Sequence, residues 1–234
     1  PILVMLFWFF RTSVYDPVNH TISFANWSFL VSDYTALNNV DVPLVWPIFG
    51  FTMIFAVIVT IIDLMIIVPA AYAVSRLNFK GKLFLLKSLF LLQAFPSIVV
   101  LIAVFYMLVY FGLINTLTGV ILICVINMMP GHAYMLKGFF DSVPWDIEQA
   151  SMVDGCTRFQ SFYKVVLPSV VPGILTISVF AFMSAYGEWF LFQVFIFDNT
   201  YYTMARFLSA LLIDGKIDYG VLAAFGIFYT IPIS

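Results

Sequence analysis

Two acidic residues lie inside long apolar stretches of the sequence. Asp63 is the one charged residue of segment 48–72, and Glu188 is the one charged residue of segment 169–197. A charge at the centre of a bilayer costs at least about 2.5–3.5 kcal/mol on insertion scales, so such residues usually face a bundle interior or a water-filled cavity. One chemistry open to this pair is ion coupling in a secondary transporter. The other is a purely structural role between packed helices, which we favour for Asp63.

The remaining reactive side chains do not form a catalytic pattern. The sequence lacks G-x-x-x-x-G-K-[ST], H-E-x-x-H and G-x-S-x-G, so no nucleotide-binding, zinc-protease or hydrolase signature is present. His20 and His132 are too isolated to indicate a metal site, and Cys124 and Cys156 lack metal-ligand spacing. We therefore expect a non-catalytic chain without metal or cofactor, in which any ATP and Mg²⁺ are bound by another polypeptide.

Composition identifies the class of protein that must position these residues. The chain is 63% hydrophobic and 9% charged, and its mean hydropathy is +1.07. A soluble domain carries roughly 25% charged residues, so this chain has too little polar surface to cover a water-soluble globule. A net charge of -2 without a basic block makes nucleic acid an unsuitable partner. The sequence predicts an integral membrane protein in contact with lipid.

Long apolar runs predict an all-α fold with six membrane crossings. A helix needs about 20 apolar residues to span the hydrocarbon core, and segments 48–72, 89–110, 117–134 and 169–197 meet this length or approach it. Segments 1–10 and 219–234 are interpreted as a first and a last helix that are cut short. We expect residues 1–47 to hold the end of the first helix and an external segment, and residues 48–234 to form the core permeation domain.

Lysine and arginine predict the orientation of these spans. Segments 75–88 and 135–168 lie on one side and hold seven of the ten basic residues, whereas segments 11–47, 111–116 and 198–218 hold three. Because basic residues concentrate in cytoplasmic loops, segments 75–88 and 135–168 are expected in the cytoplasm. The chain is thus predicted to be a multi-pass protein of a bacterial cytoplasmic (inner) membrane.

The cytoplasmic segment 135–168 carries signals for two short helices. Pro144 suits a first helical turn, and the acids that follow it suit the positive end of a helix. This helix should run to about Asp154 and end at Gly155, the usual residue for a left-handed stop. The T-x-x-Q pattern of Thr157 and Gln160 then predicts a capping box that opens a second helix.

The second helix should present one apolar face. Phe159, Phe162, Tyr163 and Val166 fall at helical spacing, and Pro168 is expected to mark a turn into the next span. Two interpretations of this pattern remain open. The pair of helices could project from the membrane as a docking device, or the second helix could lie on the lipid headgroups.

The residues of this segment resemble the signature of permease subunits of binding-protein-dependent ABC importers, which reads E-A-A, three residues, Gly, nine residues, I-x-L-P. The matching positions are Gln149, Ala150, Ser151, Gly155, Val165, Leu167 and Pro168. Gln149 replaces the motif's Glu, with Glu148 immediately before it, and Ser151 replaces the second Ala. The stretches AYAVSRLNFKGK, LQAFPSIVVLIAVFYML, GLINTLTGVIL and LKGFFDSVPWDIEQA are similar to the carbohydrate-importer branch, and above all to the shorter maltose-type permease.

The resemblance implies a role for the loop at about 137–168 as a coupling element that docks in a cleft of a cytoplasmic ATPase. The coupling residues that it implies are Glu148, Gln149, Ala150, Ser151, Asp154, Gly155, Phe159, Phe162, Leu167 and Pro168. It also implies a pathway or gate position for Glu188 and Trp189. The partners implied are a dimer of ATPase subunits, a second homologous permease, an external solute-binding protein and a carbohydrate substrate. The alternative function is an ion-coupled secondary transporter that uses Asp63 and Glu188.

Overall fold

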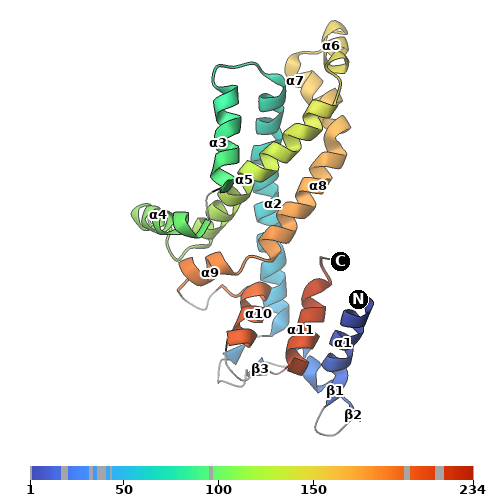
Figure 1. Ribbon diagram of the computed structural model, residues 1–234, viewed down its shortest axis with the longest axis vertical. Coiled ribbons are helices and arrows are strands. Elements are labelled where there is room, and N and C mark those ends of the chain that lie inside the picture. Colours follow the sequence, from blue (N-terminus) through green and yellow to red (C-terminus); the bar gives the residue numbers. More distant parts are fainter. Residues whose placement is uncertain are drawn as a thin grey trace. The chain divides into compact units, whose positions relative to one another are not determined.

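A computed structural model of the protein describes residues 2–16, 21–31, 34–35, 41–42, 44–94, 97–197, 201–213 and 219–233. Helices dominate these residues, as the sequence predicted (Figure 1). In chain order they are α1 (Ile2–Val14), the 3₁₀ helix η1 (Ala25–Leu30), α2 (Val45–Arg76), α3 (Lys82–Ala94), α4 (Ser97–Tyr110), α5 (Leu117–Ser142), α6 (Trp145–Val153), α7 (Arg158–Ser161), the π-helical turn η2 (Phe162–Val166), α8 (Leu167–Tyr186), α9 (Phe190–Phe195), α10 (Met204–Ile213) and α11 (Tyr219–Thr230).

Strands are minor elements of the described residues. β1 (Tyr15–Asp16) pairs antiparallel with β2 (Thr21–Ile22), and β3 (Tyr34–Thr35) pairs antiparallel with β4 (Asp41–Val42). All four strands and η1 fall in segment 11–47, which the sequence analysis expected to be external and loop-like. The same analysis placed no helix in segment 198–218, where the structure has α10.

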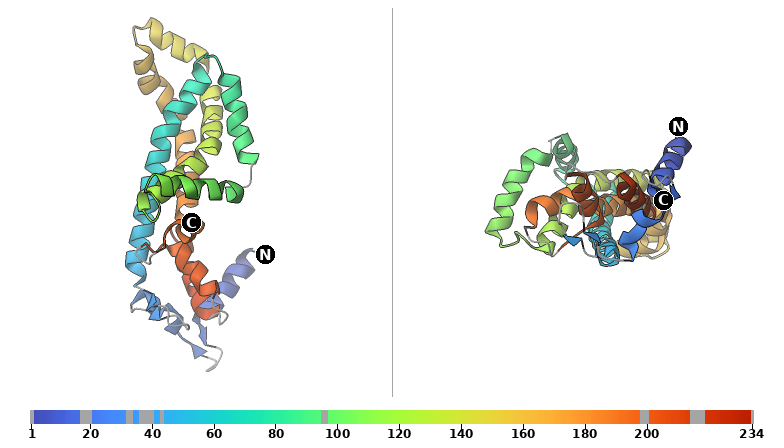
Figure 2. Two further views of the ribbon diagram at one scale, coloured as in Figure 1. Left: turned by 90° about the vertical axis from the view of Figure 1, so that its left-hand side faces the viewer. Right: turned by 90° about the horizontal axis from the view of Figure 1, so that it is seen from below.

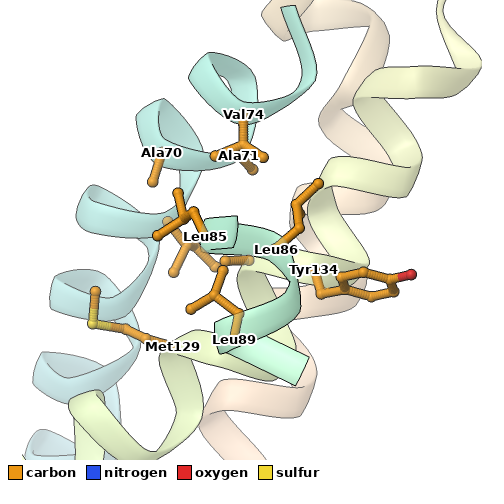
Figure 3. Close-up of a pocket in the computed structure, with 10 residues that line it drawn as sticks. Ala70, Ala71, Val74, Leu85, Leu86, Leu89, Met129 and Tyr134 are labelled. Atoms are coloured by element: carbon orange, nitrogen blue, oxygen red, sulfur yellow. The ribbon is translucent and has the colours of Figure 1, made fainter. Parts of the chain in front are cut away.

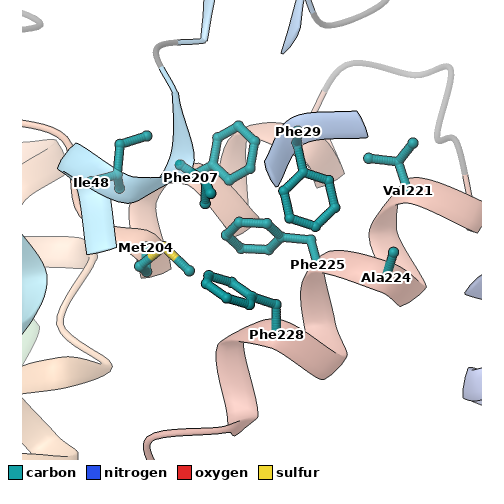
Figure 4. Close-up of a cluster of buried hydrophobic side chains, with 9 residues drawn as sticks. Phe29, Ile48, Met204, Phe207, Val221, Ala224, Phe225 and Phe228 are labelled. Carbon is teal, nitrogen blue, oxygen red and sulfur yellow. The ribbon is translucent and has the colours of Figure 1, made fainter. Parts of the chain in front are cut away.

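The chain divides into two compact units, and the first comprises Pro1–Phe55 and Tyr186–Ser234. In this unit α1 packs along α11, which also contacts η1 and α10. Phe225 lies at the middle of its aromatic core, with its ring centroid 5.6 Å from that of Phe29 and 4.4 Å from that of Phe207, both edge to face (Figure 4). Edge-to-face packing adds to area burial and favours one arrangement of these rings.

The second unit comprises Ala56–Ala185 and contains the whole of the predicted coupling loop. Its core lies where α2, α5 and α8 meet, and the buried members are Ile67, Ala71, Leu136, Phe140, Val143, Val166, Val170 and Ile177. α3 packs against α5. An apolar cavity of about 160 Å³ lies between α2, α3 and α5 (Figure 3). α6 and α7 lie at the end of the unit where α2 ends and α3 begins (Figures 1 and 2).

The predicted spans are confirmed in part. Three described helical stretches are long and apolar enough to cross a membrane, Val45–Arg76, Leu117–Ser142 and Arg158–Tyr186. Segment 89–110 holds parts of two described helices, α3 to Ala94 and α4 from Ser97, which run in different directions (Figure 1). Segment 169–197 is also interrupted, since α8 ends at Tyr186 and the short helix α9 begins at Phe190. The high average apolarity of each segment did not reveal that it holds parts of two helices.

Candidate functional site

The first helix of the motif ends in a complete Schellman arrangement. α6 runs over Trp145–Val153, with Pro144 as its N-cap residue and Asp154 as its C-cap residue. The Cys156 N–H donates to the Ser151 carbonyl at 3.0 Å, and the Gly155 N–H donates to the Met152 carbonyl at 3.2 Å. Gly155 has φ +92°, a left-handed value that only glycine adopts without strain. The predicted glycine stop is confirmed.

The second helix begins with the predicted capping box. The Gln160 N–H donates to the Thr157 hydroxyl at 3.3 Å, and the Thr157 N–H donates to the Gln160 side-chain oxygen at 2.9 Å. The helix then continues without a turn, through the π-helical residues Phe162–Val166 into α8. The expectation that Pro168 marks a turn into the next span is therefore wrong.

The π-helical turn also changes which residues face inward. Ser161 and Val166 are both fully buried although they lie five residues apart, whereas Phe159 and Tyr163 are 76% and 64% exposed. An α-helix would have placed Phe159, Phe162, Tyr163 and Val166 on one face, and the single apolar face predicted from their spacing is wrong. A π-helical turn holds more residues than an α-helical turn, so it rotates the later part of the helix. Ser161 and Val166 therefore both face inward although they are five residues apart.

Glu148 is the buried centre of the loop. Its side chain has no exposed surface, and one carboxylate oxygen accepts a hydrogen bond of 2.6 Å from the Tyr72 hydroxyl of α2. The other oxygen lies 3.3 Å from Nε of Arg76, which is 7% exposed. Arg158 approaches to 4.0 Å but is 48% exposed. Since exposed ion pairs contribute at most about 1 kcal/mol, Arg76 and Tyr72 dominate the stabilisation of this carboxylate.

Side chains at the end of α2 hold α6 in place. Arg76 donates from Nη2 to the Val143 carbonyl at 2.6 Å, and its guanidinium lies 5.3 Å from the ring centroid of Trp145. The Tyr72 ring lies 4.4 Å from the ring of Phe162, centroid to centroid. Two α2 side chains one helical turn apart thus hold the start of α6 and the start of η2 together.

The substitution of Ser151 for the motif's alanine has a local reason. The Ser151 hydroxyl lies 2.5 Å from the Ser161 hydroxyl and 2.8 Å from the Glu148 carbonyl, which it hydrogen-bonds. Both serines are buried. A buried hydroxyl without a partner costs about 1–3 kcal/mol, so Ser151 and Ser161 satisfy each other where α6 crosses α7.

The outward surface of the loop combines polar and apolar side chains. Gln149, Ala150 and Asp154 are exposed, as is Gly155. Val153 is 87% exposed, and Phe159 in the following helix is 76% exposed. Among the predicted coupling residues, Glu148 and Ser151 are interior and Phe162 is half-buried against Tyr72 and Phe140. Because Glu148 is fully buried, it is not placed to take the role of the motif's Glu toward a partner.

Asp63 lies in a second buried polar contact of the same unit. Its carboxylate oxygen is 2.6 Å from Nδ1 of His132, which joins α2 to α5. Asp63 has no exposed surface, and its other oxygen has no hydrogen-bond partner within the described part of the chain. The structural role favoured for Asp63 is consistent with this contact, and the pairing with His132 was not predicted. His20 lies outside the described residues.

Glu188 lies between the end of α8 and the start of α9, in the part of the chain assigned to the first unit. Its carboxylate accepts a 2.9 Å hydrogen bond from the Leu191 N–H, in the first turn of α9. The side chain therefore caps a helix start, which offsets part of the cost of a carboxylate in an apolar segment. Trp189 is 42% exposed and begins α9 as its N-cap residue. The pathway role expected for these two residues stays a prediction.

Comparison with known proteins places these features in a family. The family of binding-protein-dependent transport system inner membrane components matches residues 65–234, which includes the whole α6–α7 region. The chain belongs to this family. It is therefore a multi-pass inner membrane permease, as the sequence analysis predicted.

Relatives and solved structures support the assignment of this permease. It is 25% identical to the inner membrane ABC transporter permease protein YcjP of Escherichia coli, over 87% of this chain and 75% of that protein. It is 36% identical to the sulfoquinovosyl glycerol transport system permease protein SmoH of Agrobacterium fabrum, over 64% of this chain and 53% of that protein. A bacterial ABC transporter involved in the import of the acidic polysaccharide alginate shares its fold, with a TM-score of 0.82 at 19% identity over 99% of this chain and 87% of that one. The permease thus spans about half to three quarters of these two curated relatives.

Sequence reasoning missed the residues that hold the loop of this permease. Tyr72 counted only as the end of an apolar span, and Arg76 only as a positive charge on the cytoplasmic side. The one available signal was their spacing, because residues 72 and 76 lie on the same face of a helix and can reach a single carboxylate. Exposed Val153 was also missed, because a lone valine at the end of a short helix carries no pattern.

Proposed function

We propose that this permease is the transmembrane subunit of an ATP-driven importer and forms half of its translocation pathway. The 137–168 loop docks on a separate cytoplasmic ATPase subunit and carries its motion into the membrane. The observation that carries this proposal is the two-sided construction of the loop. Glu148 ties it to α2 from within, while Phe159 and Val153 are exposed outside. Exposed apolar side chains on a rigid support are typical of a protein docking surface.

Two connections would transmit motion from the loop to the spans. Arg76 and Tyr72 join α6 to the end of α2, so a displacement of α6 acts directly on that span. The helical stretch Arg158–Tyr186 passes from the loop into the apolar region without a break. Both connections are short and well packed, and rigid elements transmit displacement better than flexible linkers. The loop and two spans then move as one body when the ATPase subunits close.

The proposed substrate is a sugar or oligosaccharide. SmoH is named as a sulfoquinovosyl glycerol permease, and SugB of Mycobacterium tuberculosis, which is 37% identical over 56% of this chain, as a trehalose permease. MalD of Streptococcus pneumoniae, 31% identical over 70% of this chain, is named as a maltodextrin permease. All three names refer to carbohydrates, but each refers to a different one. Two ATPase subunits, a second permease and an external solute-binding protein would complete the transporter.

Ion-coupled secondary transport is the less suitable function. Asp63 is engaged with His132, and Glu188 holds the start of α9. The match to a binding-protein-dependent transport family also favours an importer driven by a partner subunit. The headgroup interpretation of the second helix is weakened by its continuity with α8, and it becomes an outcome of the following test.

The experiment replaces Gly155 with valine in the reconstituted transporter. A valine at φ +92° strains the turn between α6 and α7 although its Cβ would meet no atom within 4 Å, so the loop surface should be displaced while the spans stay intact. We expect uptake and substrate-stimulated ATP hydrolysis to fall at least tenfold. Gly50→Val in α2 is the matched control, since its Cβ is equally unobstructed, its φ is ordinary and it lies outside the loop. Unchanged uptake and stimulation in Gly155→Val would assign the loop to the lipid headgroups instead.

A further inference from the structure

A groove beside α3 is lined mainly by apolar side chains and also by two lysines. Its volume is about 580 Å³, within the range of ligand sites, and it lies between α3 and α5 in a single compact unit. The lining residues are Leu83, Leu86, Lys87, Phe90, Leu91, Tyr134 and Lys137. We propose that this groove binds an anionic phospholipid of the cytoplasmic leaflet, with its phosphate on Lys87 and Lys137 and an acyl chain along α3.

From Lys87 inward, the groove residues of α3 follow the order of polarity of a phospholipid. Lys87 lies about 8 Å along the helix from its start at Lys82, and Leu91 lies about 14 Å from that start, at 1.5 Å per residue. The start of α3 belongs to the predicted cytoplasmic side. The lysine ammonium can reach outward to the headgroup level while its methylene stem stays on apolar surface. Phe90 and Leu91 thus lie deeper than Lys87, where an acyl chain would run, whereas Leu83 and Leu86 lie between Lys87 and the start of the helix.

The two lysines differ in what they already bind. Lys137 forms a close ion pair with Asp141 one turn further along α5, and its side chain is 20% exposed. Lys87 is exposed and makes no salt bridge or side-chain hydrogen bond within the described residues. Lys87 is therefore the free cation of the groove. Tyr134, which is 53% exposed, also lines the groove, and its ring points away from α2 (Figure 3).

A lipid fits this surface better than a second protein subunit does. Leu83, Phe90 and Leu91 are 66%, 68% and 60% exposed, so they need an apolar neighbour. A permease of the inner membrane has lipid at this surface unless another subunit covers it. Lysine is depleted from protein interfaces, whereas basic pockets between membrane helices bind acidic headgroups. Two lysines among five apolar or aromatic residues fit a lipid site more closely.

The test uses the full-length protein purified with its associated subunits and placed in nanodiscs of phosphatidylcholine with increasing phosphatidylglycerol. Native mass spectrometry then counts the phosphatidylglycerol retained per complex. One lysine near an anionic headgroup is worth about 1 kcal/mol, which corresponds to about fivefold in affinity. We expect Lys87→Gln to lower the retention of one phosphatidylglycerol about fivefold. Phosphatidylcholine retention should not change.

The control separates this site from general attraction to the membrane surface. Lys80 is exposed in the turn before α3, belongs to the same predicted side and lies outside the groove, so Lys80→Gln should retain wild-type phosphatidylglycerol. Equal retention by wild type and Lys87→Gln would overturn the proposal. Efficient cross-linking of a Phe90→Cys variant to a second permease subunit would also overturn it, because protein would then cover the groove. Neither outcome depends on transport or ATP hydrolysis.

Discussion

Two carboxylates of the same compact unit are fully buried, and their surroundings differ. Glu148 of α6 receives the Tyr72 hydroxyl at 2.6 Å and lies 3.3 Å from Arg76. Asp63 of α2 contacts only His132, at 2.6 Å, and its other oxygen has no partner in the described part of the chain. Tyr72 lies about 14 Å further along α2 than Asp63, at 1.5 Å per residue. The two sites therefore sit at different levels of one helix.

The difference between the surroundings of Glu148 and Asp63 indicates what each contact does in the fold. The guanidinium of Arg76 stays charged, and its Nε lies 3.3 Å from the Glu148 carboxylate, in a charge contact without hydrogen-bond geometry near the end of α2. Histidine can be neutral, so the contact of Asp63 with His132 does not require two charges in the apolar part of the unit. The first contact fixes a loop to a span, and the second joins two spans. Breaking the first should cost more.

The largest effect is expected for Glu148→Ala. Removing this carboxylate leaves buried Arg76 without its counter-charge, and breaking a buried pair from one side costs about 3–5 kcal/mol. Thermal unfolding can be followed through maleimide labelling of Cys124, which is 1% exposed, in a Cys156→Ser background. Asp146→Ala on the exposed side of the same helix is the control and should change stability little. A small loss in Glu148→Ala would mean that the loop is held by other contacts.

An intermediate effect is expected at the second site. Asp63→Asn keeps an oxygen for the imidazole and should cost about 0.6–1.7 kcal/mol, the range measured for hydrogen bonds between membrane helices. His132→Ala should cost more than Asp63→Asn, because it leaves a buried carboxylate with neither oxygen bonded. The same labelling assay orders all three variants. If Asp63→Asn proved more destabilising than Glu148→Ala, the contrast between the two sites would be reversed.

A double-mutant cycle at Ser151 and Ser161 sharpens the comparison within the loop. Ser151→Ala should destabilise the protein by about 1 kcal/mol, because it leaves the Ser161 hydroxyl buried without a partner. Ser151→Ala combined with Ser161→Ala should recover most of this loss, since both polar groups are then gone. Additive losses in the double variant would show that the two hydroxyls are not coupled.

The smallest effect on stability is expected for Gln149→Glu, directly beside Glu148. Gln149 is exposed, so its replacement should change the free energy of unfolding by no more than about 0.5 kcal/mol. Under the proposed function it restores a charge that a base on the ATPase could bind, and uptake should be equal to wild type or slightly higher. A clear loss of stability would show that position 149 is not on the outer surface of the folded loop.

Local rules account for the parts of this protein that were predicted correctly from its sequence. Hydropathy identified the α2 and α5 spans because each apolar run is long enough by itself. Gly155 and the T-x-x-Q pattern at Thr157 specified the end of α6 and the start of α7, because these caps are made by residues within a few positions of one another. The same locality explains the error at Pro168, where a proline near the start of α8 was expected to mark a turn.

Only the tertiary structure decided which residues hold the loop. Tyr72 and Glu148 are 76 positions apart and Asp63 and His132 are 69 apart, so no local pattern could pair them. The π-helical turn at Phe162–Val166 is also a tertiary result, since it brings both Ser161 and Val166 inward against α6 and the core. Sequence alone determined the apolar spans, the helix caps and the likeness to a permease, because each rests on neighbouring residues. The partners of the buried charges depend on how α2, α5 and α6 pack, and that packing exists only in the folded chain.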